Sequence, residues 1–221
     1  MIQQATEPTD FTAMREAMVA SQLRTNAVDD PRVVTAMLRV PREAYLPENV
    51  APLAYRDTAV PLGRNRAANL PMATGRLLTA AEIAPTDSVL LIGAASGYTA
   101  AVLAELAANV TAVESDPELA AAARAALTGT HVTLVEGPLE AGAPGGAPYD
   151  VLVVDGAVEH LPEALVAQVK PGGSVATGLI DRGVTRLAAG RRTEGGFGLR
   201  DFADVDCVAL PGFAKPKSFQ F

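Results

Sequence analysis

The sequence predicts an α/β fold with a doubly wound, mostly parallel sheet, a helical extension at its N-terminal end and antiparallel strands at its C-terminal end. Between residues 88 and 179, short apolar runs alternate with segments of helical character. This alternation is typical of a parallel sheet with helices on both faces. In addition, a glycine turn at residues 93–98 follows the first of these runs and leads into a helix. That is the entry unit of nucleotide-binding α/β sheets.

The N-terminal third is expected to be helical and to pack on the sheet. Thr9 or Asp10 can cap the first helix, and Pro31 stands at a favourable first position of the second. We divide the chain into residues 1–71, helices and a loop, and residues 72–221, the main domain, within one compact unit. The expected helices cover residues 10–23, 30–37 and 72–83, with irregular chain at 40–61 and a polar loop at 63–71.

From Ser88 onward, each apolar run predicts a strand and each intervening alanine-rich or leucine-rich segment a helix. Ser115 or Asp116 can cap the helix that begins at Pro117. Beyond residue 180, alternating apolar and polar residues predict antiparallel strands. The expected strands cover residues 89–92, 110–114, 132–136, 151–155, 174–179, 184–187 and 199–210, and the expected helices residues 99–107, 117–127 and 161–170.

The glycine turn and the acid after it suggest a ligand. Small residues let a ligand approach the backbone, and Glu114 lies 17 residues after Gly97 at the end of the next apolar run. A carboxylate there can accept hydrogen bonds from both hydroxyls of a ribose. The strand ends should gather Gly93, Glu114, Gly137 and Asp155 at one edge of the sheet. This is the layout of S-adenosylmethionine-dependent methyltransferases; a tight strand–helix connection without a ligand is the alternative.

Composition narrows the possible partners. The 221 residues are 49% hydrophobic and carry a net charge of −7. Such an acidic surface repels phosphates, which argues against nucleic acid and anionic membranes as partners. Cys207 is the only cysteine, and His131 and His160 lie far apart in the sequence, so we expect neither a disulfide nor a metal site. Residues 1–10 lack the pattern of a signal peptide, and the expected location is cytoplasmic.

Several motifs spread over nearly the whole chain resemble those of one enzyme family. Ser-Gly-Tyr at residues 96–98 and Ala-Val-Leu-Ala at residues 101–104 are similar to the cofactor motif of the protein-L-isoaspartate O-methyltransferase family. The resemblance implies a Rossmann-like fold, S-adenosylmethionine as the cofactor and isoaspartyl residues of damaged proteins as the substrate. The other similar segments are residues 21–24, 30–33, 36–37, 40–43, 45–47, 54–57, 61–63, 147–150 and 170–173.

The departures from the family concern the acceptor site above all. Where the family usually reads Gln-Thr-Ile-Ser-Gln-Pro, residues 66–71 read Arg-Ala-Ala-Asn-Leu-Pro. Ala67 and Asn69 thus replace two hydroxyl-bearing residues that cradle the isoaspartyl carboxylate in the family. The chain is interpreted as a divergent member with an altered acceptor loop. Four further positions differ from the family pattern: Leu91, Ala95, Pro138 and Asp155.

The resemblance also implies a set of site residues. Glu114 would hold the ribose of the cofactor, and the amide of Asn69 could still orient an acceptor carboxylate, because methyl transfer needs alignment more than proton chemistry. The cofactor-binding candidates are Gly93, Ala95, Ser96, Gly97, Tyr98, Glu114 and Asp155, and the catalytic candidates are Asn69 and Asp57.

Some of these residues have a plainer interpretation. Tyr98 could pack the helix, Asp57 could cap a loop, and Asp155 could cap a turn instead of contacting a ligand. Arg64 and Arg66 could attract a substrate carboxylate, but we interpret both as solvated.

Three functions are compatible with this sequence. The first is S-adenosylmethionine-dependent methylation of isoaspartyl carboxylates, with a damaged protein or peptide as the partner. The second is a cofactor-binding homologue with a binding or regulatory role, and the third a methyltransferase with another acceptor. Glu114 and the glycine turn favour cofactor binding, whereas Ala67, Asn69 and Pro138 favour the second and third.

Overall fold

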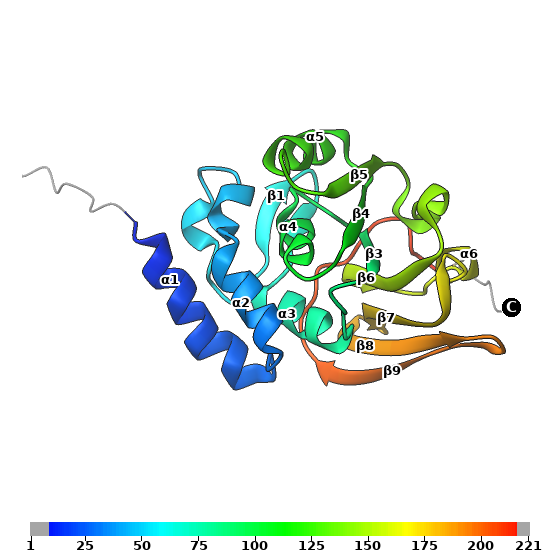
Figure 1. Ribbon diagram of the computed structural model, residues 1–221. Helices are drawn as coiled ribbons and strands as arrows, with labels where there is room; N and C mark the ends of the chain where they lie inside the picture. The colour runs from blue at the N-terminus through cyan, green and yellow to red at the C-terminus, as the bar shows by residue number, and fades with distance from the viewer. Residues whose placement is uncertain (1–8, 216–221) are drawn as a thin grey trace, which may run out of the picture.

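The computed structural model describes residues 9–215. It contains a seven-stranded sheet with helices on both faces and a separate two-stranded hairpin (Figure 1). The predicted fold class is therefore confirmed. Residues 1–8, which belong to the segment judged unlike a signal peptide, lie outside the described residues.

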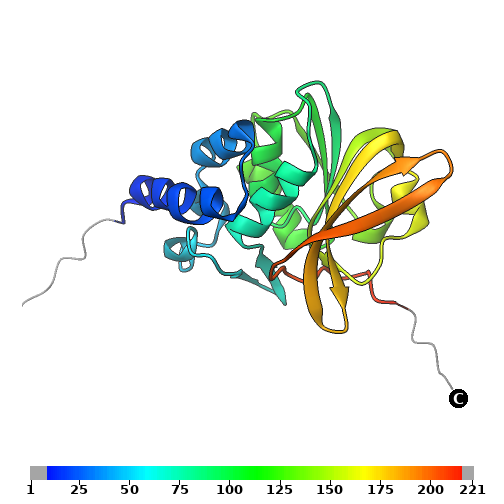
Figure 2. The same cartoon turned by 90° about the horizontal axis from the view of Figure 1, so that it is seen from below.

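The large sheet has the strand order β5-β4-β3-β6-β7-β8-β9, in which β3 to β7 pair in parallel and β8 and β9 pair antiparallel. Seen from below, β8 and β9 form a long ribbon along one side of the molecule (Figure 2). The strands are β3 Ser88–Ile92, β4 Asn109–Glu114, β5 Val132–Glu136, β6 Tyr149–Val158, β7 Val169–Asp181, β8 Val184–Thr193 and β9 Gly196–Asp204.

The strand order reverses between β3 and β6, because β4 and β5 lie on one side of this pair and β7 on the other. Open α/β sheets bind ligands in the crevice beyond the carboxyl ends of the strands at such a point. Gly93 directly follows β3, and Asp155 directly follows the β6 residue that pairs with Ile92. Both predicted ligand positions therefore reach this crevice.

The helices begin where the sequence offers caps. The side chain of Asp10 accepts a hydrogen bond from the N–H of Ala13 at 3.0 Å, and that of Asp30 one from Arg32 at 2.8 Å, which satisfies amides that the helix itself leaves free. The helices are α1 Phe11–Met18, continued by a π-helical turn Val19–Leu23, α2 Pro31–Arg39, α3 Pro71–Ala80, α4 Tyr98–Ala104, α5 Pro117–Ala126 and α6 Glu163–Val166.

The N-terminal helices share one core with the sheet. Met18 and Met37 from this region are buried in the same cluster as Leu77 of α3 and Leu91 of β3. Burying a side chain of this size contributes about 1.5–3 kcal/mol, so residues 11–39 are held by packing on the main sheet. The boundary at residue 71 stays a prediction.

The expected polar loop at residues 63–71 is wrong. Strands β1 Val60–Gly63 and β2 Arg66–Ala68 form an antiparallel hairpin there. Arg64 and Asn65 have φ angles of 54° and 56°, the left-handed conformation that a type I′ hairpin turn requires at both positions. The strands are too short to show a periodic pattern, and an arginine is an uncommon residue in this conformation.

The C-terminal half also differs from expectation. Residues 171–173, which precede the strand expected at 174–179, lie within β7, and the helix expected at residues 161–170 is only α6. The last expected strand ends at Asp204 instead of 210. The chain then returns across the sheet edge, where Ala157 donates to the carbonyl of Val208 at 2.7 Å and accepts from Leu210 at 3.0 Å.

Candidate cofactor and acceptor site

The turn between β3 and α4 needs its glycines. Gly93 and Gly97 have φ angles of 83° and 104°, and a Cβ atom on Gly93 would lie 2.9 Å from the Leu210 side chain. The N–H groups of Gly93 and Ala94 both donate to the carbonyl of Val113 in β4, at 3.1 and 3.0 Å. The turn is thereby held against the neighbouring strand end.

Glu114 lies at the predicted place, at the end of β4 beside this turn. Its side chain is fully buried, and the N–H of Ala95 donates to it at 2.7 Å. The N–H groups of Ser115 and Asp116 donate to its other oxygen at 2.8 and 2.9 Å. Backbone amides from two loops thus converge on one carboxylate.

The same carboxylate is paired with Arg66, at the start of β2. Both terminal nitrogens of Arg66 donate to Glu114, one to Oε1 and the other to Oε2 at 2.9 Å. The Arg66 side chain is only 7% exposed, so its interpretation as a solvated residue is wrong. A buried carboxylate requires a counter-charge or dense hydrogen bonding, and Arg66 supplies the charge.

Arg64 is likewise more than a solvated side chain. It pairs with Asp116 and Glu118, each at 2.7 Å, near the start of α5. Arg64 is about half exposed in both pairs, so each pair contributes little by itself. Together with Arg66 they join the hairpin to the end of β4 and the beginning of α5.

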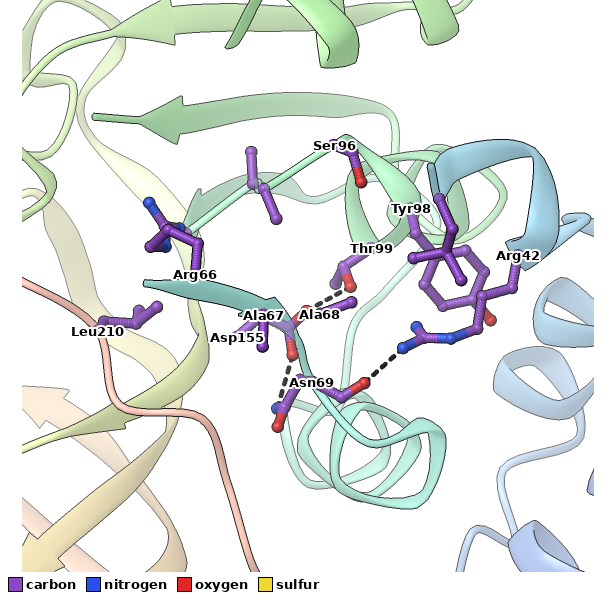
Figure 3. A pocket seen from close by; sticks show the side chains of 14 residues that line it. Arg42, Arg66, Ala67, Ala68, Asn69, Ser96, Tyr98, Thr99, Asp155 and Leu210 are labelled. Atoms are coloured by element: carbon purple, nitrogen blue, oxygen red, sulfur yellow. Dashed lines mark hydrogen bonds between the residues drawn. The ribbon is translucent and has the colours of Figure 1, made fainter. Parts of the chain in front are cut away.

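Asp155 is the centre of a second buried cluster (Figure 3). It accepts hydrogen bonds from Asn69 at 3.0 Å, from Thr74 at 2.9 Å and from the hydroxyl of Thr99. Sequence reasoning missed both threonines. Thr99 could have been found, because the first turn of a helix after a glycine turn faces the same crevice.

Asn69 bridges this anion and a buried cation. Its backbone carbonyl accepts from Arg42 at 2.5 Å, while its amide group donates to Asp155 and to the sulfur of Cys207, the latter at 3.2 Å. The side-chain oxygen accepts from the N–H of Val208 at 3.2 Å. Both polar ends of the Asn69 side chain therefore have partners inside the protein.

Arg42 was not among the predicted site residues. It is 1% exposed, donates to the carbonyl of Ala54 at 2.9 Å, and its guanidinium lies 4.7 Å from the ring centre of Tyr98. Burial lowers the pKa of Arg42, and the nearby Tyr98 and Asp155 oppose that effect. Such a cation over an aromatic face is stabilising.

Tyr98 is buried among neighbouring side chains and also lines the cavity beside the glycine turn. Its ring lies edge-on to Tyr45 at 6.0 Å, and its buried hydroxyl has no hydrogen-bond partner among the described residues. Burial raises the pKa of Tyr98 well above its ordinary value. The hydroxyl of Ser96 donates to the carbonyl of Tyr45, so the α4 start is tied to the 3-10 turn Arg42–Tyr45.

The candidates do not all meet in one cavity. Asp57 is exposed and lies outside the cavity lining, although partial burial raises its pKa. Gly97 and Glu114 also lie outside this lining. The predicted residues that do line the cavity are Asn69, Gly93, Ala95, Ser96, Tyr98 and Asp155. The roles assigned to all of these residues stay predictions.

Two spaces lie along the crevice. The inner cavity between Asn69 and the glycine turn is only about 20 Å³, close to the space for one water molecule. An outer pocket of about 520 Å³ is bordered by Ser115, Pro117 and Pro211. Arg66 and Leu210 line both spaces and lie near each other at one side of the cavity (Figure 3). The kinds of residue around these spaces suit a ligand such as S-adenosylmethionine. However, Arg66 is bound to Glu114, the carboxylate that would hold the ribose of that ligand.

The described residues offer neither a cluster of metal ligands nor a membrane-spanning helix. Within residues 9–215, no three His, Cys, Asp or Glu side chains are grouped so that they could hold a metal ion. None of the described helices has both the length and the apolar character needed to cross a membrane.

Comparisons with known proteins agree with the resemblance seen in the sequence. The model of the family described as protein-L-isoaspartate(D-aspartate) O-methyltransferase matches residues 13–210. Protein-L-isoaspartate O-methyltransferase 1 of Rhodopseudomonas palustris (strain HaA2) is 40% identical over 93% of this chain and 86% of its own length. The Methylorubrum extorquens (strain PA1) enzyme is 39% identical over 91% of this chain and 90% of its own length.

A solved structure shows the same fold. The protein-L-isoaspartate O-methyltransferase from Plasmodium falciparum, in complex with S-adenosyl-L-homocysteine, superposes with a TM-score of 0.74 over 92% of this chain and 99% of its own, at 18% identity. Methyltransferases of this family use S-adenosylmethionine, the cofactor that the sequence predicted. The predicted family and enzyme class are confirmed: this chain belongs to the protein-L-isoaspartate O-methyltransferase family.

Proposed function

We propose that this chain binds S-adenosylmethionine at the ends of β3 and β4 and methylates isoaspartyl carboxylates of damaged cytoplasmic proteins, as a step of their repair. The observation that carries the proposal is the position of Glu114, whose buried carboxylate accepts from the N–H of Ala95 in the glycine turn. A carboxylate at the second strand end beside a glycine turn suits the hydroxyls of a ribose.

For methyl transfer, the protein mainly has to align the acceptor with the methyl group of the cofactor. When bound, S-adenosylmethionine supplies a methyl group on a sulfonium; as a carboxylate oxygen bonds to the methyl carbon, the carbon–sulfur bond breaks and a neutral thioether leaves. An acceptor carboxylate is already ionised near neutral pH, so no general base is required. The residues between Ala67 and Asn69 would position the acceptor, because they line the inner cavity opposite the glycine turn.

A second candidate is methyl transfer to an acceptor without negative charge, and one observation favours it. Asp155 lines the inner cavity, and hydrogen bonds from Asn69, Thr74 and Thr99 stabilise a negative charge there. Two carboxylates within a few ångströms repel each other, whereas a neutral acceptor meets no such repulsion.

Two measurements test the proposal together. Calorimetric titration with S-adenosylhomocysteine should show saturable binding, and labelled methyl groups should be transferred to an isoaspartyl peptide but not to the same peptide with ordinary aspartate. Binding without transfer to the isoaspartyl peptide would favour another acceptor or a binding role. Absence of both binding and transfer would reject the proposal.

A further inference from the structure

Arg66 holds the carboxylate on which the proposed cofactor depends. Glu114 accepts five N–H bonds, two from Arg66 and one each from Ala95, Ser115 and Asp116. A carboxylate offers about four lone-pair sites. No acceptor capacity is left for ribose hydroxyls while Arg66 keeps its place.

Arg66 also divides the space that a cofactor would need. The inner cavity beside Gly93 and the outer pocket beside Ser115 share only Arg66 and Leu210 among their lining residues. With about 20 Å³ inside, the inner space is far smaller than an ordinary small-molecule site. Withdrawal of the Arg66 side chain would join the two spaces next to Glu114.

The ion pair between Arg66 and Glu114 is stable enough to compete with a ribose for the carboxylate. The Arg66 and Glu114 side chains are 7% and 0% exposed, so water and salt screen their attraction only weakly. The hairpin that carries Arg66 is tied to the same region by the pairs of Arg64 with Asp116 and Glu118. In this structure Arg66 therefore stays bound to Glu114 and keeps the inner cavity and the outer pocket separate.

We propose that Arg66 determines the affinity for the cofactor by competing with its ribose for Glu114. The inference rests on the proposed function, since it assumes that the ribose binds at Glu114. The apparent affinity of a site equals its intrinsic affinity multiplied by the fraction of molecules in which the site is free. Arg66 lowers that fraction, and the residue in its place sets how tightly the cofactor binds.

The direct test replaces Arg66 with glutamine, which keeps a polar side chain but removes the positive charge. We expect Arg66→Gln to bind S-adenosylhomocysteine at least about tenfold more tightly than the wild type in calorimetric titration. In the absence of ligand the variant should melt at a lower temperature, because the Glu114 carboxylate loses its buried counter-charge. A purely structural role of Arg66 would lower both the melting temperature and the affinity.

Arg64→Gln is the matched control on the same hairpin. It removes both ion pairs of Arg64 and leaves the bond between Arg66 and Glu114 in place. Its affinity for S-adenosylhomocysteine should stay within about twofold of the wild type. A gain as large as that of Arg66→Gln would show that loosening the hairpin is sufficient, and would overturn the role given to Arg66.

A second variant covers the case in which Arg66→Gln does not fold. Arg66→Lys keeps the charge but loses the bidentate geometry, and it should bind several times more tightly than the wild type. If the wild type binds and the foldable variants bind no more tightly, this inference is wrong while the proposed function stands. If neither the wild type nor any variant binds at millimolar ligand, both are wrong.

Discussion

Arg66 and Glu114, 48 residues apart in the chain, form a bidentate ion pair inside the protein. The pair connects the β1–β2 hairpin to the end of β4. Within it, Arg66 takes up the hydrogen-bonding capacity of Glu114, the carboxylate expected to bind a ribose. Residues 67–69, which are proposed to position the acceptor, directly follow Arg66 in the chain. The pair therefore links the proposed cofactor site to the proposed acceptor site.

The first prediction concerns stability. Glu114→Gln should lower the free energy of unfolding by about 3–5 kcal/mol, because it leaves the Arg66 cation buried without its partner. Urea denaturation measures this change. Glu118→Gln removes an exposed partner of Arg64 and should leave the unfolding free energy nearly unchanged. Equal effects of the two substitutions would contradict the account of a buried pair.

A second prediction concerns Ala95, whose φ angle of 49° lies in the left-handed region. A Cβ atom in this conformation costs about 1–2 kcal/mol, and glycine avoids that cost. After allowing for the greater freedom of glycine in the unfolded chain, Ala95→Gly should raise the free energy of unfolding by about 0.5–1 kcal/mol.

Its control is Ala94→Gly, at a neighbour that does not have a positive φ angle. That substitution should lower the free energy of unfolding, because it adds only freedom to the unfolded chain and removes a buried methyl group. Thermal or urea unfolding of both variants shows whether each substitution raises or lowers the free energy of unfolding. The same sign for both would show that strain at Ala95 is not significant.

A third prediction concerns Cys207. Burial and the negative charge of Asp155 raise the pKa of its thiol to about 12. At about pH 8 the native protein should react with iodoacetamide about a thousandfold more slowly than the unfolded chain, since only the thiolate attacks. The folded state holds this proton more tightly than the unfolded state, so the stabilisation is present below about pH 9 and is lost as the pH rises toward 12. Comparable rates for both states would contradict this.

The fourth prediction addresses the acceptor. Ala67 lines the inner cavity, and Ala67→Thr adds a hydroxyl there. A hydrogen bond to a charged acceptor contributes about 1.5–3 kcal/mol, so methylation of an isoaspartyl peptide should rise about tenfold with little change in S-adenosylhomocysteine affinity. Ala67→Val has nearly the same shape without the hydroxyl and should give no gain. An equal gain with valine would attribute the effect to shape alone.

The sheet could be predicted because its signal is local. Each of β3, β4 and β5 is a short apolar run next to a capped helix or a glycine turn, and the strand ends came within two residues of the expected positions. Glu114 and Gly93 follow from the same pattern, because parallel strands bring their carboxyl ends to one edge. The structure places both at that edge.

The contacts of the site could not be predicted in the same way. The pairing of Arg66 with Glu114 and the bond of Asn69 to Asp155, 86 residues away, depend on where the hairpin lies on the sheet. No periodic pattern in the sequence indicates where the hairpin lies on the sheet. Arg66 was interpreted as solvated because charged residues are usually exposed, and the three-residue strand that buries it is too short to detect.

The most direct measurement is the structure of this protein in complex with S-adenosylhomocysteine. The account predicts that both ribose hydroxyls donate to Glu114, that Arg66 has left that carboxylate, and that the inner cavity and outer pocket have joined beside Gly93. A ligand bound elsewhere on the molecule, or a ribose bound while Arg66 still holds both oxygens of Glu114, would contradict the account.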